Sequence, residues 1–429
     1  MAVIHAEAAL SVLCALSDDR FAHSRATAVT RPESFDEQSK GGASVSFESK
    51  GSGQEVLEFE ASPVATQIPV HKGPISDVAV SPDGNRLLVT NYGSDSVSVI
   101  DIGSCRVVDT VGGLAEPFAI AVGGAERAYV STVSPAYDAI QVIDLATNTV
   151  VVSHQVALSV SDLAVSADGK HVYISRNGAR GADIAALDTA TGRIQVVDIA
   201  TAAGTATEAL QVSPDGGRLY VGVNGPAGGQ VVVVDTGLNS DEPAGRGRWR
   251  RKSAKSTKPA SKAASQPASP SVIATIEIGL PVRDVAISPN GALVYVASSG
   301  PEAAVIDIVD TRTNKITGTR KIAEVTGLIT RLTLSGDGDR AYLVSDDSVT
   351  MLCTLTQDVL DTVDMASQPS CVAESPDGGF LYIADYSGAV TVVPVAMNAE
   401  TRIEQAALES KRSVDLFVPD LLQYDAALV

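Results

Sequence analysis

Cysteine is scarce in this chain of 429 residues, and its four cysteines lie far apart, at Cys14, Cys105, Cys353 and Cys371. None belongs to a Cys-x-x-Cys pair or to a cluster of cysteines and histidines. This spacing argues against a disulfide scaffold, a structural zinc site and c-type haem attachment. We therefore expect neither a metal nor a cofactor.

Long apolar runs are also missing. No stretch of about 18 apolar residues occurs, so we expect no transmembrane helix. The short apolar stretch from Ala8 to Leu16 follows Glu7 instead of a basic segment, which argues against a Sec signal peptide. The expected compartment is therefore the cytosol, where thiols stay reduced.

The common catalytic motifs are absent as well. The sequence contains no GxSxG elbow, no P-loop and no HExxH pair. Its five histidines show no pattern of a catalytic triad, and we expect each to be structural: His5, His23, His71, His154 and His171.

What the chain does contain is a repeated turn of the Ser-Pro-Asp-Gly type. Its copies begin at Ser81, Gly123, Ser166, Ser213, Ser288, Ser335 and Ser375. They are 40 to 47 residues apart, except for one interval of 75 that holds a low-complexity insert of 27 residues, 244–270. Asp-Gly and Asn-Gly between apolar runs favour hairpins because glycine adopts a positive φ. Seven copies with this period predict a seven-bladed β-propeller, an all-β fold.

Each copy is expected to form four short strands. In the first copy these cover residues 75–80, 86–91, 96–101 and 106–111. The last copy has only three, at 370–374, 380–385 and 389–395. The segment 63–70 (PVATQIPV) is similar to the fourth strand of another copy, 272–278 (VIATIEI). We predict that it completes the last blade and so removes two open sheet edges.

The repeats resemble a known family. LLVTNYGSDSVSVID at 87–101 is similar to the YVTN-type β-propeller repeat, and VSPDGGRLYVGVNG at 212–225 matches its first half. The composition resembles that of actinobacterial proteins, and the chain is similar to mycobacterial seven-bladed propellers of the cell envelope. That resemblance implies an association with the inner-membrane machinery that exports trehalose mycolates. The family also includes surface-layer proteins and lactonase-like enzymes, so the fold does not settle the activity.

Three segments are expected to lie outside the blades. We assign residues 63–397 to the propeller, 1–62 to a partly disordered N-terminal extension and 398–429 to a C-terminal extension. Residues 244–270 should form a disordered loop in the fourth blade, because Pro, Ser and Ala dominate there between basic residues.

This basic loop differs most from the rest of the chain. It contains eight cations, no acid and the only tryptophan: Arg246, Arg248, Trp249, Arg250, Arg251, Lys252, Lys255, Lys258 and Lys262. The whole chain carries a formal charge of −19, so the remainder carries −19 − 8 = −27. We expect the loop to meet an anionic membrane surface or a membrane protein. A solvated loop without a partner is the alternative, and nucleic acid is not expected beside so acidic a body.

A second set of candidate residues lies four positions before each turn, on the innermost strand of each copy. In chain order the residues there are Asp77, Ala119, Asp162, Ala209, Asp284, Arg331 and Cys371. Three carboxylates and a guanidinium are therefore expected to line a central channel. They are candidates to bind a ligand at the channel mouth, either a cation on the carboxylates or an anion on Arg331. Alternatively, they tie the blades together by hydrogen bonds.

These observations favour a non-enzymatic interaction scaffold. Together with the family resemblance, they predict a cytoplasmic monomer at the inner face of the plasma membrane that supports an envelope-lipid transport complex handling trehalose monomycolate. The alternative is a lactonase-like hydrolase with its site at the channel mouth. A pocket with converging acidic, basic or histidine side chains would favour the enzyme.

Overall fold

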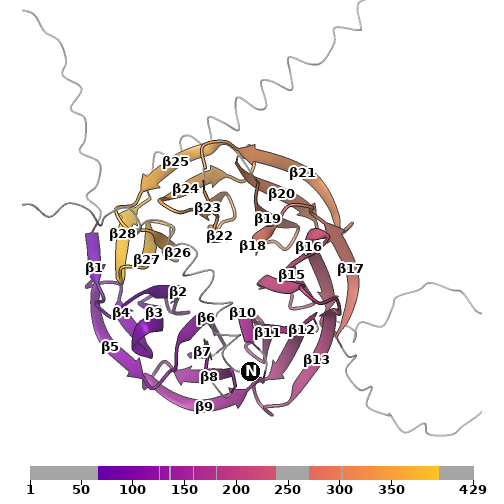
Figure 1. Ribbon diagram of the computed structural model, residues 1–429. Coiled ribbons are helices and arrows are strands. Elements are labelled where there is room, and N and C mark those ends of the chain that lie inside the picture. The colour runs from indigo at the N-terminus through magenta and orange to yellow at the C-terminus, as the bar shows by residue number, and fades with distance from the viewer. Residues whose placement is uncertain are drawn as a thin grey trace, which may run out of the picture. The chain divides into compact units, whose positions relative to one another are not determined.

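The computed structural model describes residues 66–124, 126–134, 137–157, 159–179, 181–237, 270–300, 303–325 and 327–395. These residues form seven four-stranded antiparallel sheets around a central axis (Figure 1). The seven-bladed β-propeller predicted from the repeated turn is therefore confirmed. The expected extensions 1–62 and 398–429 and nearly all of the basic loop lie outside the described residues.

The first four blades follow one another along the chain. Blade 1 contains β2 (Ile75–Val80), β3 (Arg86–Asn91), the 3-10 turn η1 (Tyr92–Ser94), β4 (Ser96–Asp101) and β5 (Arg106–Gly112). Blade 2 contains β6 (Pro117–Gly123), β7 (Arg127–Thr132), β8 (Ala139–Asp144) and β9 (Thr149–Gln155). Blade 3 contains β10 (Ser159–Val165), β11 (His171–Gly178), β12 (Gly181–Asp188) and β13 (Ile194–Ala200). Blade 4 contains β14 (Ala206–Val212), β15 (Arg218–Gly225), β16 (Gly228–Asp235) and β17 (Ser271–Glu277).

The last three blades complete the ring. Blade 5 contains β18 (Val282–Ile287), β19 (Leu293–Ser299), β20 (Ala304–Asp310) and β21 (Lys315–Ile322). Blade 6 contains β22 (Arg331–Leu334), β23 (Arg340–Val344), β24 (Ser348–Cys353) and β25 (Val359–Asp364). Blade 7 contains β26 (Pro369–Glu374), β27 (Phe380–Asp385), β28 (Ala389–Pro394) and, from the start of the described chain, β1 (Thr66–Pro69).

Ring closure occurs inside blade 7. Strand β1 pairs antiparallel with β28, with Thr66 opposite Val392 and Pro69 opposite Ala389. Ile68 of β1 is 3% exposed and packs into a cluster that joins blades 7 and 1. The prediction that the segment before the first copy completes the last blade is confirmed.

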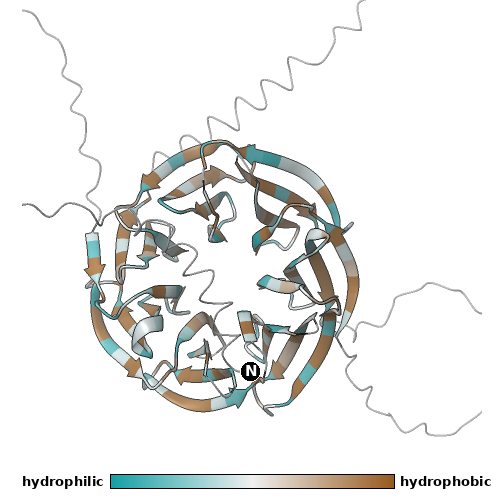
Figure 2. Cartoon of the chain, in the orientation of Figure 1, coloured by the Kyte–Doolittle hydropathy of each residue, from teal (hydrophilic) through white to brown (hydrophobic). Residues whose placement is uncertain are grey.

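Burial rises from the outside of each blade to its middle. The second and third strands, such as β3 and β4, are buried along nearly their whole length because neighbouring blades cover both faces. The outermost strands are mostly exposed, and β5 buries only Val111. Most of the core is aliphatic, coloured brown in Figure 2, with one tyrosine from the second strand of most blades, such as Tyr173 and Tyr220. This agrees with an aromatic content of only 4%.

The repeated turns also contact one another across blades. Gly84, at φ +71°, lies against Pro376 of the preceding turn, and Gly291, at φ +69°, lies against Pro214. A Cβ atom on Gly84 would come within 2.8 Å of the Pro376 ring. At these two contacts a side chain on the glycine would meet the proline ring of the preceding turn.

Candidate functional site: the central channel

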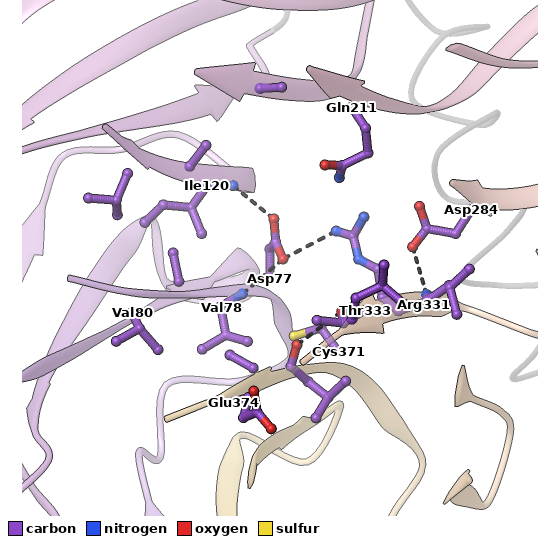
Figure 3. A pocket seen from close by; sticks show the side chains of 18 of the residues that line it. Asp77, Val78, Val80, Ile120, Gln211, Asp284, Arg331, Thr333, Cys371 and Glu374 are labelled. Atoms are coloured by element: carbon purple, nitrogen blue, oxygen red, sulfur yellow. Dashed lines mark hydrogen bonds and ion pairs between the residues drawn. The ribbon is translucent and has the colours of Figure 1, made fainter. Parts of the chain in front are cut away.

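The innermost strands of all seven blades line one cavity of about 520 Å³. Its lining includes Asp77, Asp162, Asp284 and Arg331, all four expected there from the sequence. Figure 3 shows Asp77, Asp284 and Arg331 on its wall. Cys371 also lines the cavity, whereas Ala119 and Ala209 at the equivalent positions of blades 2 and 4 do not, although all three are equally buried. In six blades the first strand has a register shift just before or at the channel position, and β22, which begins at Arg331, lacks it.

The three aspartates make the same pair of hydrogen bonds. Each carboxylate accepts one hydrogen bond from the backbone amide of the residue that follows it. It accepts a second from the next blade, where the donor is the amide of the residue just after the channel position. For Asp162 these donors are the backbone N–H groups of Leu163 and Leu210, both at 2.8 Å. For Asp284 they are those of Val285 and Leu332, also at 2.8 Å. Each side chain thus joins two blades at the channel wall.

Asp77 makes these bonds and an ion pair as well. Its carboxylate accepts from the amides of Val78 and Ile120 at 2.9 Å. Its Oδ1 lies 3.2 Å from Nη2 of Arg331, which reaches across from blade 6 to blade 1 (Figure 3). The Gln211 side chain points towards the same guanidinium in Figure 3. One guanidinium therefore faces three carboxylates, and only Asp77 pairs with it directly.

This imbalance of charge shifts the titration of the channel groups. Burial raises the pKa of Asp162 to about 7 and that of Asp284 to about 6, because neither carboxylate has a cation in direct contact. Arg331 opposes these shifts, and its own pKa is raised by Asp77. Burial also raises the pKa of the Cys371 thiol to about 12, so that thiol is a poor nucleophile at neutral pH.

A second polar group on the cavity wall was not found from the sequence. Glu374 of blade 7 accepts a 2.5 Å hydrogen bond from the Tyr342 hydroxyl and a 2.8 Å bond from the amide of Gly336, both in blade 6. Nη2 of Arg340 lies 3.6 Å from the same carboxylate. Glu374 comes just before a Ser-Pro-Asp-Gly turn, and this position relative to the turn is the sequence feature that could have predicted its location on the cavity wall.

Two asparagines that the sequence analysis passed over also join blades. The Asn177 amide bonds to both backbone groups of Thr207, and the Asn224 amide bonds in the same way to Val282, at 2.8 to 3.2 Å. Both asparagines lie near the end of a second strand and are followed by glycine, at Gly178 and Gly225. That recurrence is the pattern that would have identified them.

The described part of the chain offers no group of three or more metal-binding side chains close enough to hold an ion. Nor does any described helix have the length and apolarity needed to cross a membrane. His71 lies between β1 and β2, His154 lies in β9 and His171 begins β11, so these three do not meet. The cations of the basic loop lie outside the described residues.

The fold and the channel define a seven-bladed β-propeller whose innermost strands are tied together by buried carboxylates. The chain is 55% identical over 381 residues to the seven-bladed beta-propeller protein Rv1057 of Mycobacterium tuberculosis, covering 87% of this chain and 96% of the relative. The chain therefore belongs to the family of that propeller protein.

Two further comparisons agree with this assignment. Residues 62–101 match the WD domain, G-beta repeat family. The matched repeat runs from β1 to the end of β4, so it begins with the outer strand of one blade and continues into the next. A chain of Kuenenia stuttgartiensis hydrazine synthase resembles this chain with a TM-score of 0.61 and 18% identity, covering 80% of this chain and 99% of that one. At that identity the likeness concerns the fold alone.

Proposed function

We propose that this protein is a non-enzymatic interaction scaffold. The observation that carries the proposal is the use of the channel carboxylates. Asp77, Asp162 and Asp284 each spend both oxygens on backbone amides of two blades, which is a structural task. A general base or nucleophile must direct a lone pair at a substrate, whereas the amide bonds orient both oxygens of each carboxylate towards the backbone, even though each oxygen keeps a second lone pair.

The proposed partner is a membrane-bound complex that transports cell-envelope lipids such as trehalose monomycolate, at the inner face of the plasma membrane. The support is the family resemblance and the charge of the basic loop. Eight Lys and Arg residues near an anionic leaflet contribute on the order of 1 kcal/mol each, enough to hold an acidic body at the surface. This attraction weakens as salt shortens the Debye length.

The test compares two variants of the full chain in its native host. In the first, all eight Lys and Arg residues of the basic loop are changed to Gln. In the second, the neighbouring Ser253, Ser256, Thr257 and Ser261 are changed to Ala as a matched control. We expect the first variant to leave the membrane fraction and to lose the co-purifying transport proteins, and the control to keep both. Equal membrane partition of both variants would rule out the loop as the tether.

A lactonase-like hydrolase is the second candidate, and the cavity supports it. Its volume of about 520 Å³ falls in the range of small-molecule sites, and Arg331 offers a donor for a carbonyl or carboxylate. A panel of lactones incubated with the wild-type chain and with Arg331→Met decides between the two functions. Hydrolysis that the substitution abolishes, in a variant that still melts cooperatively, would favour the enzyme over the scaffold.

A further inference from the structure

Among the described residues, each of the seven outermost strands leaves one edge without a strand partner. Such edges pair readily with other chains unless charge, proline, shortness or a bulge blunts them. Strand β1 is four residues long and ends in Pro69. The other outer strands carry charged residues, with β9 as the exception: Arg106 and Asp109 on β5, Asp198 on β13, Glu277 on β17, Lys315, Arg320 and Lys321 on β21, and Asp361 and Asp364 on β25.

Strand β9 has the sequence TVVVSHQ, without Asp, Glu, Lys or Arg. Its three consecutive valines, Val150, Val151 and Val152, are 38%, 45% and 40% exposed. Figures 1 and 2 show β9 on the outer circumference as a largely apolar strand. Burial lowers the pKa of His154, so the strand is uncharged at neutral pH. It does share one protective device with its neighbours, a register shift between its pairs with Val142 and Ile143.

Two acids near the turn that precedes β9 are already engaged. Asp144 accepts hydrogen bonds from the amides of Ala146 and Thr147 at 3.0 and 3.1 Å. Asp109, on β5 of the neighbouring blade, accepts a 2.8 Å bond from the side chain of Asn148 in that turn. These contacts tie both carboxylates to the turn before the strand.

The lack of charge favours one occupant in particular, a second copy of the same strand. In a two-fold contact the same patch meets itself, so a strand with charge of one sign brings like charges together. Strands β13, β17, β21 and β25 each carry charge of a single sign and are penalised in this way. Strand β5 has one charge of each sign, and its Asp109 is held by Asn148. Strand β9 can pair with its own copy without placing like charges of the strand opposite each other.

We propose that the β9 edge of blade 2 is a self-association surface through which two copies of this chain pair. This differs from the monomer expected from the sequence, and it is independent of the scaffold function proposed above. Because the acidic bodies repel each other while the contact itself is apolar, association strengthens as salt rises. The membrane tether has the opposite salt dependence.

The test is sedimentation of the full chain over a range of concentrations and salt. The mass should rise from 44.1 kDa towards twice that value. Val151→Lys places two like charges in the contact and should weaken pairing on the order of tenfold or more. Val108→Lys is the matched control, because Val108 is an equally placed and more exposed valine of β5, at 58%, and it should leave pairing unchanged. Both sites are on the surface, so both variants should melt like the wild type.

Three results would overturn the proposal. The first is a mass of one chain at every concentration and salt. The second is an equal loss of pairing in Val108→Lys, which would place the contact elsewhere or make it nonspecific. The third comes from hydrogen exchange of residues 149–155. If the outward amides of β9 are protected in dilute samples that contain single chains, another segment of the same chain covers the edge.

Discussion

Blade 1 and blade 7 are neighbours with different construction. Blade 1 is one continuous segment, and a turn joins its outermost strand β5 to β4. The outermost strand of blade 7, β1, has no such turn, and its ladder with β28, the burial of Ile68 and Val70, and the backbone bonds of Val70 and His71 to Gly388 hold it there. The first and last strands of the ring therefore meet inside a blade and not between two blades. Backbone hydrogen bonds and apolar packing join them there in place of a covalent link.

The two blades also differ at the channel. Blade 1 carries Asp77, which bonds to the next blade and pairs with Arg331. Blade 7 carries Cys371 at the equivalent position and makes no such bridge, although Arg331 spans it to reach Asp77. A carboxylate at this position bonds to two blades, but its charge is buried. It is therefore either paired with a cation, as Asp77 is, or has a raised pKa, as Asp162 and Asp284 have. The two blades thus show two ways of holding the ring together: strand pairing in blade 7, and side-chain bonds between neighbouring blades in blade 1.

The largest effect is expected from removing β1. Deletion of residues 1–70 leaves β28 with an open edge and removes the burial of Ile68 and Val70, each 6% exposed or less. The free energy of unfolding should fall on the order of 5 kcal/mol or more. Deletion of residues 1–44, which keeps β1, is the control and should melt close to the full chain. Equal melting temperatures for both deletions would contradict closure by β1.

Alanine substitutions at the channel position of blades 1 and 7 compare how much each side chain stabilises the ring. Asp77→Ala leaves the amides of Val78 and Ile120 without their acceptor and Arg331 without its partner. It should cost about 2–4 kcal/mol in chemical denaturation. Cys371→Ala, at the same position of blade 7, removes a buried thiol that bridges no blades and should cost about 1 kcal/mol. If the two variants are equally stable, the bridge contributes nothing.

The carboxylates that lack a direct cation should make stability depend on pH. The folded-state pKa of Asp162, about 7, lies above its unfolded value near 3.9, so its contribution is complete below about pH 4 and is lost as pH rises through 7. Asp162→Asn removes this titration. From pH 4.5 to 7.5 the wild type should therefore lose on the order of 3 kcal/mol of unfolding free energy relative to the variant. Melting curves across that range check the slope, and parallel curves would show that Asp162 does not titrate there.

The smallest effect is expected where the turns of blades 1 and 7 touch. Gly84→Ala forces a side chain into a left-handed conformation and against Pro376, which should cost about 1 kcal/mol. Gly103→Ala is the control, since its φ is not positive and the nearest atom to its Cβ lies 3.8 Å away. A larger loss at Gly103 than at Gly84 would mean that the contact between turns is unimportant.

The sequence by itself determined the number of blades, most strand positions and the closing strand. The turn residues fix the hairpins locally, because Pro and Asp-Gly restrict the backbone whatever surrounds them. The strands expected at 75–80, 86–91 and 96–101 appear with the same bounds. The channel position was also readable, since its distance from the turn is constant and a strand keeps its register over four residues.

Only the tertiary structure decided what those channel residues do. Asp162 and Leu210, or Arg331 and Asp77, belong to different blades, and nothing local records that their polar atoms meet. The same holds for Glu374 with Tyr342 and for the asparagines that bond to the next blade. These contacts depend on how far each blade rotates about the axis, and that rotation is set by the packing of side chains across the blade interfaces. A repeat therefore fixes the blade, whereas the assembled ring fixes the partners of its polar groups.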